Sequence, residues 1–228
     1  LLYIARDNEN AYRIKNEIDF YSSTNTQTMS FPDWETLPYD NFSPHQDIIS
    51  DRIATLNKLP QVSKGALIVP VQTLMQRLPP VHFMEGQSLV LTTGQRFSIA
   101  NERQRLHEAG YRSVQTVIEH GEYAVRGSLM DIYPMGSPLP FRIDLFDDEI
   151  ESLRTFDPDT QRTADHIDST LVLPAKEIPL DPKAISLFRD RWHNTFDTDV
   201  RRCQIYQDVS NAIAPPGIEF YLPYFFDK

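Results

Sequence analysis

The sequence is poor in cysteine, in glycine and in long apolar runs, and each shortage excludes a class of protein. Its 228 residues contain one cysteine, Cys203, so no internal disulfide can form and a reducing compartment is indicated. No apolar run approaches the roughly 18 residues that a membrane-spanning helix requires, and no signal-peptide pattern is present. These absences predict a cytoplasmic protein without a membrane partner.

The glycines lack the spacing of a phosphate-binding loop. They lie at positions 65, 86, 94, 110, 121, 127, 136 and 217. Neither G-x-x-x-x-G-K-[ST] nor G-x-G-x-x-G can be assembled from these positions, so no loop offers consecutive backbone N–H groups to a nucleotide. The sequence therefore predicts no nucleotide cofactor in this chain.

Metal and catalytic motifs are also absent. The six histidines have no H-x-x-x-H or H-E-x-x-H spacing, and no serine lies in a nucleophile elbow. The run 143–149 imitates the strand-then-Asp-Glu motif that holds magnesium in helicases, but Asp147 and Asp148 fit a two-residue hairpin turn better. His120 either lines an exposed face or has a plain loop role, which is the preferred interpretation. We expect no metal site and no catalysis here.

The chain also lacks positive charge: its formal net charge is −10 at pH 7. Duplex DNA binding depends on Lys and Arg side chains that neutralise phosphates, which needs a concentrated basic surface. The charge therefore disfavours unaided DNA binding and favours a protein partner.

The first third of the chain alternates between strand and helix patterns. Strand-like runs lie at 1–5, 28–31 and 65–71, and helical patterns follow Asp7 and Phe42. The run 65–71 is continuously apolar, as expected of a strand buried on both faces. This order predicts the fold class α/β, with a doubly wound, mostly parallel sheet.

The second helix has a complete start signal. Ser43 fits the N-cap, Pro44 fits the first helical position, and Gln46 completes a capping box. We therefore expect this helix to begin at Pro44.

The rest of the chain divides into an inserted domain and a helical end. Turn residues and short alternating strands predict a smaller α+β domain with an antiparallel meander at 88–174, inserted between 1–87 and 175–228. In the last part we expect one helix opening at Asp181-Pro182 and another starting near Asp199. Both ends of the sequence are apolar, and we expect that the chain was cut from a longer protein.

The meander carries the main functional hypothesis. Alternation in 141–146 places Ile143 and Leu145 on one face and Arg142, Asp144 and Phe146 on the other. In 122–126 the same rule places Arg126 on the outward face. Arginines beside an exposed aromatic ring are typical of protein-binding hot spots. The alternative is an Arg142–Asp144 pair within the sheet, with Phe146 folded into the core.

Several strings closely resemble the N-terminal region of bacterial transcription-repair coupling factors. These strings are 33–40 (DWETLPYD), 42–50 (FSPHQDIIS), 67–77 (LIVPVQTLMQR), 120–127 (HGEYAVRG), 141–156 and 217–219 (GIE). The resemblance covers essentially the whole chain. The related helicase subunit UvrB has a weaker version of the meander and a long aromatic hairpin after the second strand, whereas only eleven residues separate Phe31 from Ser43 here.

The resemblance implies a UvrB-like module without ATPase activity. It implies domain 1a at 1–87, domain 2 at 88–174 and the start of domain 1b at 175–228. Domain 2 would recruit the excision-repair protein UvrA through the residues that match the family's recruiting motif: Arg126, Arg142, Asp144 and Phe146. RNA polymerase, DNA, ATP and magnesium would bind other regions of the full-length protein. The alternative is a fragment of an ATP-dependent, damage-verifying helicase subunit of the UvrB type.

Overall fold

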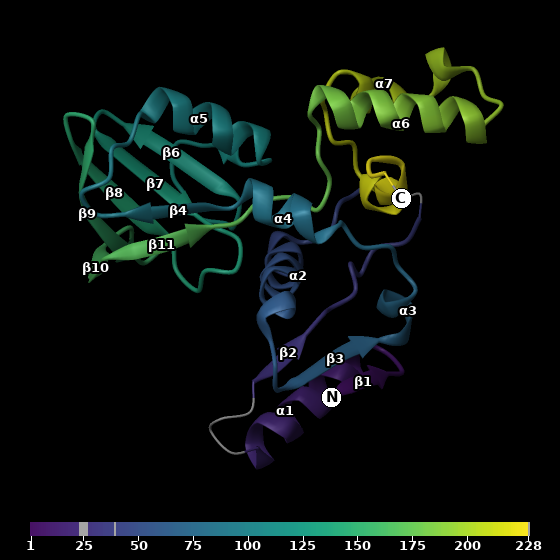
Figure 1. Ribbon diagram of the computed structural model, residues 1–228, viewed down its shortest axis with the longest axis horizontal. Coiled ribbons are helices and arrows are strands. Elements are labelled where there is room, and N and C mark those ends of the chain that lie inside the picture. The colour runs from purple at the N-terminus through teal and green to yellow at the C-terminus, as the bar shows by residue number, and fades with distance from the viewer. Residues whose placement is uncertain (23–26, 39, 228) are drawn as a thin grey trace.

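The computed structural model describes residues 1–22, 27–38 and 40–227 of the chain. Figure 1 shows a small sheet near the N-terminus, a larger sheet with its covering helix α5, and a separate group of helices near the C-terminus. Helix α2 (Gln46–Lys58) lies between the two sheets.

The small sheet is parallel. Its strands are β1 (Leu2–Ala5), β2 (Thr28–Ser30) and β3 (Ala66–Pro70), in the order β1-β3-β2. Helix α1 (Asn8–Tyr21) begins after Asp7, whose Oδ1 accepts a hydrogen bond from the N–H of Asn10 at 2.8 Å. The helix packs Ala11, Ile14 and Ile18 against Ala5 and Ile68. The helical spacing expected for these three residues is confirmed.

Helix α2 begins later than its start signal predicted. Residues 43–45 are not helical, and His45 is the N-cap, with its Nδ1 accepting from the N–H of Asp47 at 3.3 Å. Because the side chain of His45 caps the helix, the predicted Ser43–Gln46 capping box is wrong. The elements that follow are η1 (Leu59–Gln61), α3 (Val71–Leu74) and α4 (Val81–Gln87).

The largest sheet is mostly antiparallel, as expected for the meander of the inserted domain. Its order is β10-β9-β8-β7-β6-β5, and only β5 and β6 are parallel. Its strands are β5 (Arg112–Ser113), β6 (Glu122–Arg126), β7 (Leu129–Tyr133), β8 (Phe141–Phe146), β9 (Glu149–Phe156) and β10 (Thr163–Ile167). Short turns join β6 to β9 in succession, and such turns connect antiparallel neighbours. The chain is thus a mixed α/β protein in which the small sheet is parallel and the meander antiparallel, and the described residues form no larger doubly wound sheet.

A covering layer completes this part of the molecule. Strands β4 (Leu89–Thr92) and β11 (Ser169–Val172) pair antiparallel, and helix α5 (Ile99–Glu108) follows β4. The inward side chains of the large sheet join one apolar cluster with Leu91, Leu106 and Val172 from this layer. The large sheet therefore buries the apolar side chains of one face in this cluster, and the residues of its other face lie outside the cluster.

The same apolar cluster extends into α2, where Ile49 and Ile53 are buried. The loop after β7 approaches this helix closely at Gly136, which has φ +76 and donates its N–H to Ser50 Oγ at 2.8 Å. A Cβ added to Gly136 would lie 2.9 Å from the Cβ of Ala54. Glycine is therefore required at this contact between α2 and the meander.

The C-terminal part has its own aromatic core. Its elements are α6 (Pro182–Thr195), η2 (Val200–Arg202), α7 (Gln204–Ser210) and η3 (Ile218–Tyr224). Asp181 caps α6 as predicted, accepting from the N–H groups of Lys183 and Ala184. The helix expected to start near Asp199 begins later, at Gln204. Asp199 caps only a single 3-10 turn, and the backbone is extended again at Cys203.

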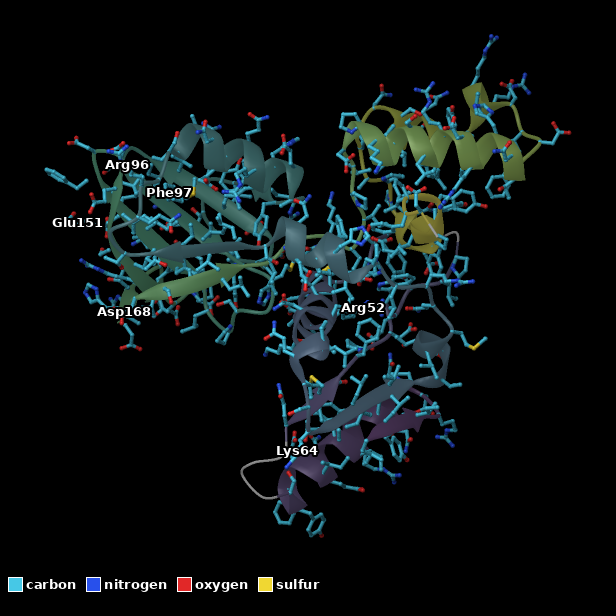
Figure 2. The ribbon with its side chains drawn as sticks, viewed as in Figure 1. Arg52, Lys64, Arg96, Phe97, Glu151 and Asp168 are labelled. Carbon is cyan, nitrogen blue, oxygen red and sulfur yellow. The ribbon has the colours of Figure 1, made fainter. Side chains whose placement is uncertain are left out.

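A buried arginine joins the first part of the chain to the segment before α6. Arg52 is fully buried and its guanidinium contacts both carboxylate oxygens of Glu177, at 2.5 and 3.1 Å. It donates to the carbonyl of Pro32 at 2.8 Å and lies over the rings of Phe31 and Trp34. In Figure 2, Arg52 is labelled between the small sheet and the C-terminal helices. A buried ion pair with several partners fixes these segments in one arrangement.

Candidate protein-interaction site

The outward face of the meander is built by alternation in β8. Phe141, Ile143 and Leu145 are buried on the apolar side of this strand. Arg142, Asp144 and Phe146 therefore lie on the opposite side. The predicted spans of β6 and β8 are confirmed, and β8 ends at the tight turn that was expected at Asp147 and Asp148, where Asp147 has φ 53.

Arg142 is held in a fixed orientation by an aspartate on the neighbouring strand. Its Nε and Nη2 donate to Oδ1 and Oδ2 of Asp131 at 2.7 and 2.9 Å. Donating hydrogen bonds to the Asp131 carboxylate raises the pKa of Arg142 further above its usual range, and the guanidinium lies 5.1 Å from the ring centre of Phe156. Such a fork-to-fork pair fixes the plane of the guanidinium. Nη1 has no hydrogen-bond partner among the described residues.

Arg126 approaches the same aspartate from β6. Its Nη2 lies 3.8 Å from Oδ2 of Asp131 and donates to the carbonyl of Gln115 at 3.1 Å. The Arg126 side chain is about half exposed, whereas the Asp131 side chain is almost fully buried. One buried carboxylate thus positions two of the predicted arginines.

Asp144 and Phe146 occupy the end of the same face. Asp144 accepts from Ser152 Oγ at 3.1 Å and does not form the direct ion pair with Arg142 that the alternative interpretation assumed. Phe146 is 70% exposed, so its ring is not folded into the core. Figure 2 labels Arg96 and Glu151 at this end of the sheet, and Arg96 forms a β-bridge with Glu149 after the turn. The four predicted residues therefore share one face, with Phe146 projecting at its edge.

Sequence reasoning missed two members of this face. Asp131 alternates with the buried Met130 and Ile132, so the rule that found Arg142 also places Asp131 outward. Arg154 pairs directly opposite Arg142 in the register of β8 and β9. Its buried Nε has no hydrogen-bond partner among the described residues. The face therefore contains a third arginine, which lies opposite Arg142 across the two strands.

His120 has a structural role beside this face. Its Nδ1 lies 2.9 Å from Oδ1 of Asp47 and its Nε2 lies 2.9 Å from the carbonyl of Ser137, while its ring packs on Tyr133. These contacts tie the meander to the first turn of α2. The preferred interpretation of His120 as a loop residue agrees with them.

The face carries arginines, carboxylates and an exposed aromatic ring. In the part of the chain that the structure describes, no three His, Cys, Asp or Glu side chains are grouped as a metal site requires. Within residues 1–22, 27–38 and 40–227, no helix has the length and apolar character needed to cross a membrane.

The chain is similar in sequence to known proteins. A family model described as the UvrB interaction domain matches residues 89–178. The transcription-repair-coupling factor of Escherichia coli K12 is 52% identical over 228 residues, which are 100% of this chain and 20% of that protein. The chain belongs to the transcription-repair-coupling factor family.

Two further members of the family show how far the similarity extends. The transcription-repair-coupling factor of Haemophilus influenzae is 48% identical over 98% of this chain and 19% of its own length. That of Myxococcus xanthus is 29% identical over 100% of this chain and 20% of its own length. The chain thus spans about a fifth of the length of the curated relatives it matches.

The outward face lies wholly inside the matched domain. Every residue that builds it falls between 89 and 178, namely Arg126, Asp131, Arg142, Asp144, Phe146 and Arg154. The junction residue Glu177 also falls inside this match, whereas its partner Arg52 lies outside it.

Proposed function

We propose that this chain is a protein-docking module that recruits UvrA within a transcription-repair-coupling protein. The observation that supports it is the outward face of the meander, where an exposed Phe146 lies beside arginines that Asp131 holds in place. The match of residues 89–178 to the UvrB interaction domain supports the choice of partner.

Each residue has a separate part in docking. Phe146 inserts its exposed ring into an apolar pocket of UvrA, which buries a large apolar surface. Arg126 and the free Nη1 of Arg142 donate charge-assisted hydrogen bonds to carboxylates of UvrA. Asp144 orients the arginines or accepts a basic group of the partner.

The orientation of Arg142 is fixed before binding, which lowers the entropy cost of docking. Association costs side-chain entropy whenever a flexible side chain must be ordered. The two bonds to Asp131 have already ordered the guanidinium before UvrA arrives. Less side-chain entropy is therefore lost when Arg142 contacts the partner, and more of the interaction energy contributes to the affinity.

The proposal includes no catalysis by this chain. Its support is the lack of a phosphate-binding glycine loop in the sequence and the purely structural roles of Asp147 and Asp148 in a turn. ATP, magnesium, DNA and RNA polymerase are assigned to other parts of a longer protein. A larger doubly wound sheet containing β1–β3 and the division at 1–87, 88–174 and 175–228 belong to the same proposal. Purified chain should release no phosphate from ATP.

Titration of UvrA with purified variants tests the docking face. Arg142→Ala should weaken binding by about 2 kcal/mol, or roughly thirtyfold in Kd, because it removes a pre-oriented donor. Arg103→Ala is the matched control, since Arg103 is an exposed arginine on α5 in the same domain.

Calorimetry or surface plasmon resonance gives the Kd, and circular dichroism checks the fold. Equal affinities of wild type and a folded Arg142→Ala variant would contradict the site. No binding of UvrA by the wild-type chain would contradict the function itself.

A further inference from the structure

A cavity lies away from the docking face, where the segment 174–182 crosses the end of α5. Its volume is about 600 Å³, within the range of 300–1,000 Å³ that is usual for small-molecule sites. The apolar part of its wall comes from α4 and from a proline-rich segment: Phe83, Pro174, Ile178, Pro179, Leu180 and Pro182.

The wall is held by hydrogen bonds between separate segments. The N–H of Ala175 donates to the carbonyl of Ala109 at 2.8 Å, and the buried hydroxyl of Tyr111 donates to the carbonyl of Leu173 at 2.6 Å. Together with the three prolines, these bonds make the cavity preformed. A ligand entering it would have little conformational entropy to remove.

Lys176 supplies a positive charge to this apolar cavity. Its aliphatic stem lies over Gly110, where an added Cβ would come within 2.8 Å of the Lys176 Cγ. Gly110 has φ +90 and ends α5, so both the turn and the stem require glycine there. Burial lowers the pKa of the Lys176 ammonium, while the nearby Glu219 carboxylate acts in the opposite direction.

No acid within the described residues forms an ion pair with Lys176. Asp181, which also lines the cavity, is engaged as the N-cap of α6, and Glu108 accepts from Gln104 at 3.0 Å. Arg112 is the other fixed cation of the wall, but its guanidinium is paired with Glu119 and Glu122. Lys176 is therefore a cation of this cavity that has no ion pair among the described residues, with Glu219 as its nearby acid, and a partly desolvated charge gains most from an anion.

We propose that this cavity binds a small amphiphilic acid, with its acidic group on the Lys176 ammonium and its apolar body against Phe83 and the prolines of 174–182. The site is separate from the docking face and does not depend on the proposed function. It requires both parts of the ligand, because one side of the wall is apolar and Lys176 supplies a cation that has no ion pair among the described residues.

Two fluorescent probes that share one ring system test this proposal. 8-Anilinonaphthalene-1-sulfonate is an apolar anion, and N-phenyl-1-naphthylamine has the same rings without the sulfonate. Wild-type chain should bind the sulfonate at one saturable site and the neutral probe more weakly. Lys176→Met should raise the Kd of the sulfonate about tenfold, the size expected for one charge-assisted hydrogen bond, and leave the neutral probe unchanged.

Lys64→Met is the control variant, because Lys64 is exposed, does not line the cavity and lies beside the small sheet in Figure 2. A second measurement does not depend on the folding of any variant: amine acetylation followed by mass spectrometry. The sulfonate should protect Lys176 from acetylation, and the neutral probe should not. Equal Kd values of wild type and a folded Lys176→Met variant for the sulfonate, or no protection of Lys176, would overturn the proposal.

Discussion

Asp131 is the residue that turns separate arginines into one surface. Its carboxylate receives two hydrogen bonds from Arg142 and lies near Arg126, while its own side chain is almost completely buried. A buried carboxylate is costly unless charged partners surround it. Here those partners are the arginines of the proposed docking face, so stability and function share the same contact.

Asp131→Asn should lower the free energy of unfolding by about 1–3 kcal/mol, because it removes a charge from a hydrogen-bonded, mostly buried pair. Urea denaturation at neutral pH measures this loss. Asp144→Asn is the matched control on the same face, since Asp144 has a single side-chain partner, Ser152, and should cost less. Equal losses in the two variants would contradict the special position of Asp131.

Alternation placed Arg126, Arg142, Asp144 and Phe146 on one face from the sequence, and the structure places them there. The pairing of Arg142 could not be found in the same way. Alternation gives the face of each side chain but not the register between strands, and register decides that Asp131 lies opposite Arg142. The position of Arg154 was missed for the same reason.

At the scale of elements, η3 closes over a cluster of charges. Glu219 of η3 lies near Glu177 and Lys176, and its buried Oε2 has no hydrogen-bond partner among the described residues. Burial raises the pKa of Glu219 to about 7 from 4.5. Packing of Phe220 against Trp34 holds the element in place nonetheless.

The packing of η3 should therefore depend on pH. The folded state holds the Glu219 proton up to about pH 7 whereas the unfolded state releases it near 4.5, so stability falls as the pH rises through this window. Relative to Glu219→Gln, wild type should lose about 2 kcal/mol of unfolding free energy between about pH 5 and about pH 8.

Urea denaturation at several pH values measures this difference. Glu17→Gln is the control, since Glu17 is an exposed glutamate on α1. A wild-type curve parallel to that of Glu219→Gln would show that this carboxyl titrates normally.

The type of each helix and strand could be predicted more reliably than its first and last residues or its neighbours in the sheet. Local patterns found β6, β8 and the cap of α6, because alternation and capping are properties of a few neighbouring residues. They failed at α2, where His45 competes with Ser43 for the cap, and at α7, where Cys203 interrupts the helix. The antiparallel direction of the meander could be predicted because short strands follow one another there, whereas the doubly wound sheet expected around β1–β3 depends on distant partners and stays a prediction.

At the scale of the whole molecule, an acidic chain presents a locally cationic face. The chain has a net charge of −10, whereas this face holds Arg126, Arg142 and Arg154 together with Asp131 and Asp144. The apolar cluster that supports this face also includes Ile49 and Ile53 of α2, so it crosses the proposed border at residue 87. The face therefore rests on both parts of the chain, and the border stays a prediction.

The central claim is that Phe146 inserts into UvrA. Phe146→Ala should weaken UvrA binding by about 2 kcal/mol or more, as expected for an exposed aromatic residue that becomes buried at an interface. Tyr12→Ala is the matched control, because Tyr12 on α1 is an aromatic residue that is also 70% exposed. Isothermal titration of UvrA into the wild-type chain and both variants is the decisive measurement. A thirtyfold or larger rise in Kd for Phe146→Ala alone is predicted, and equal Kd values for the two folded variants would contradict the account.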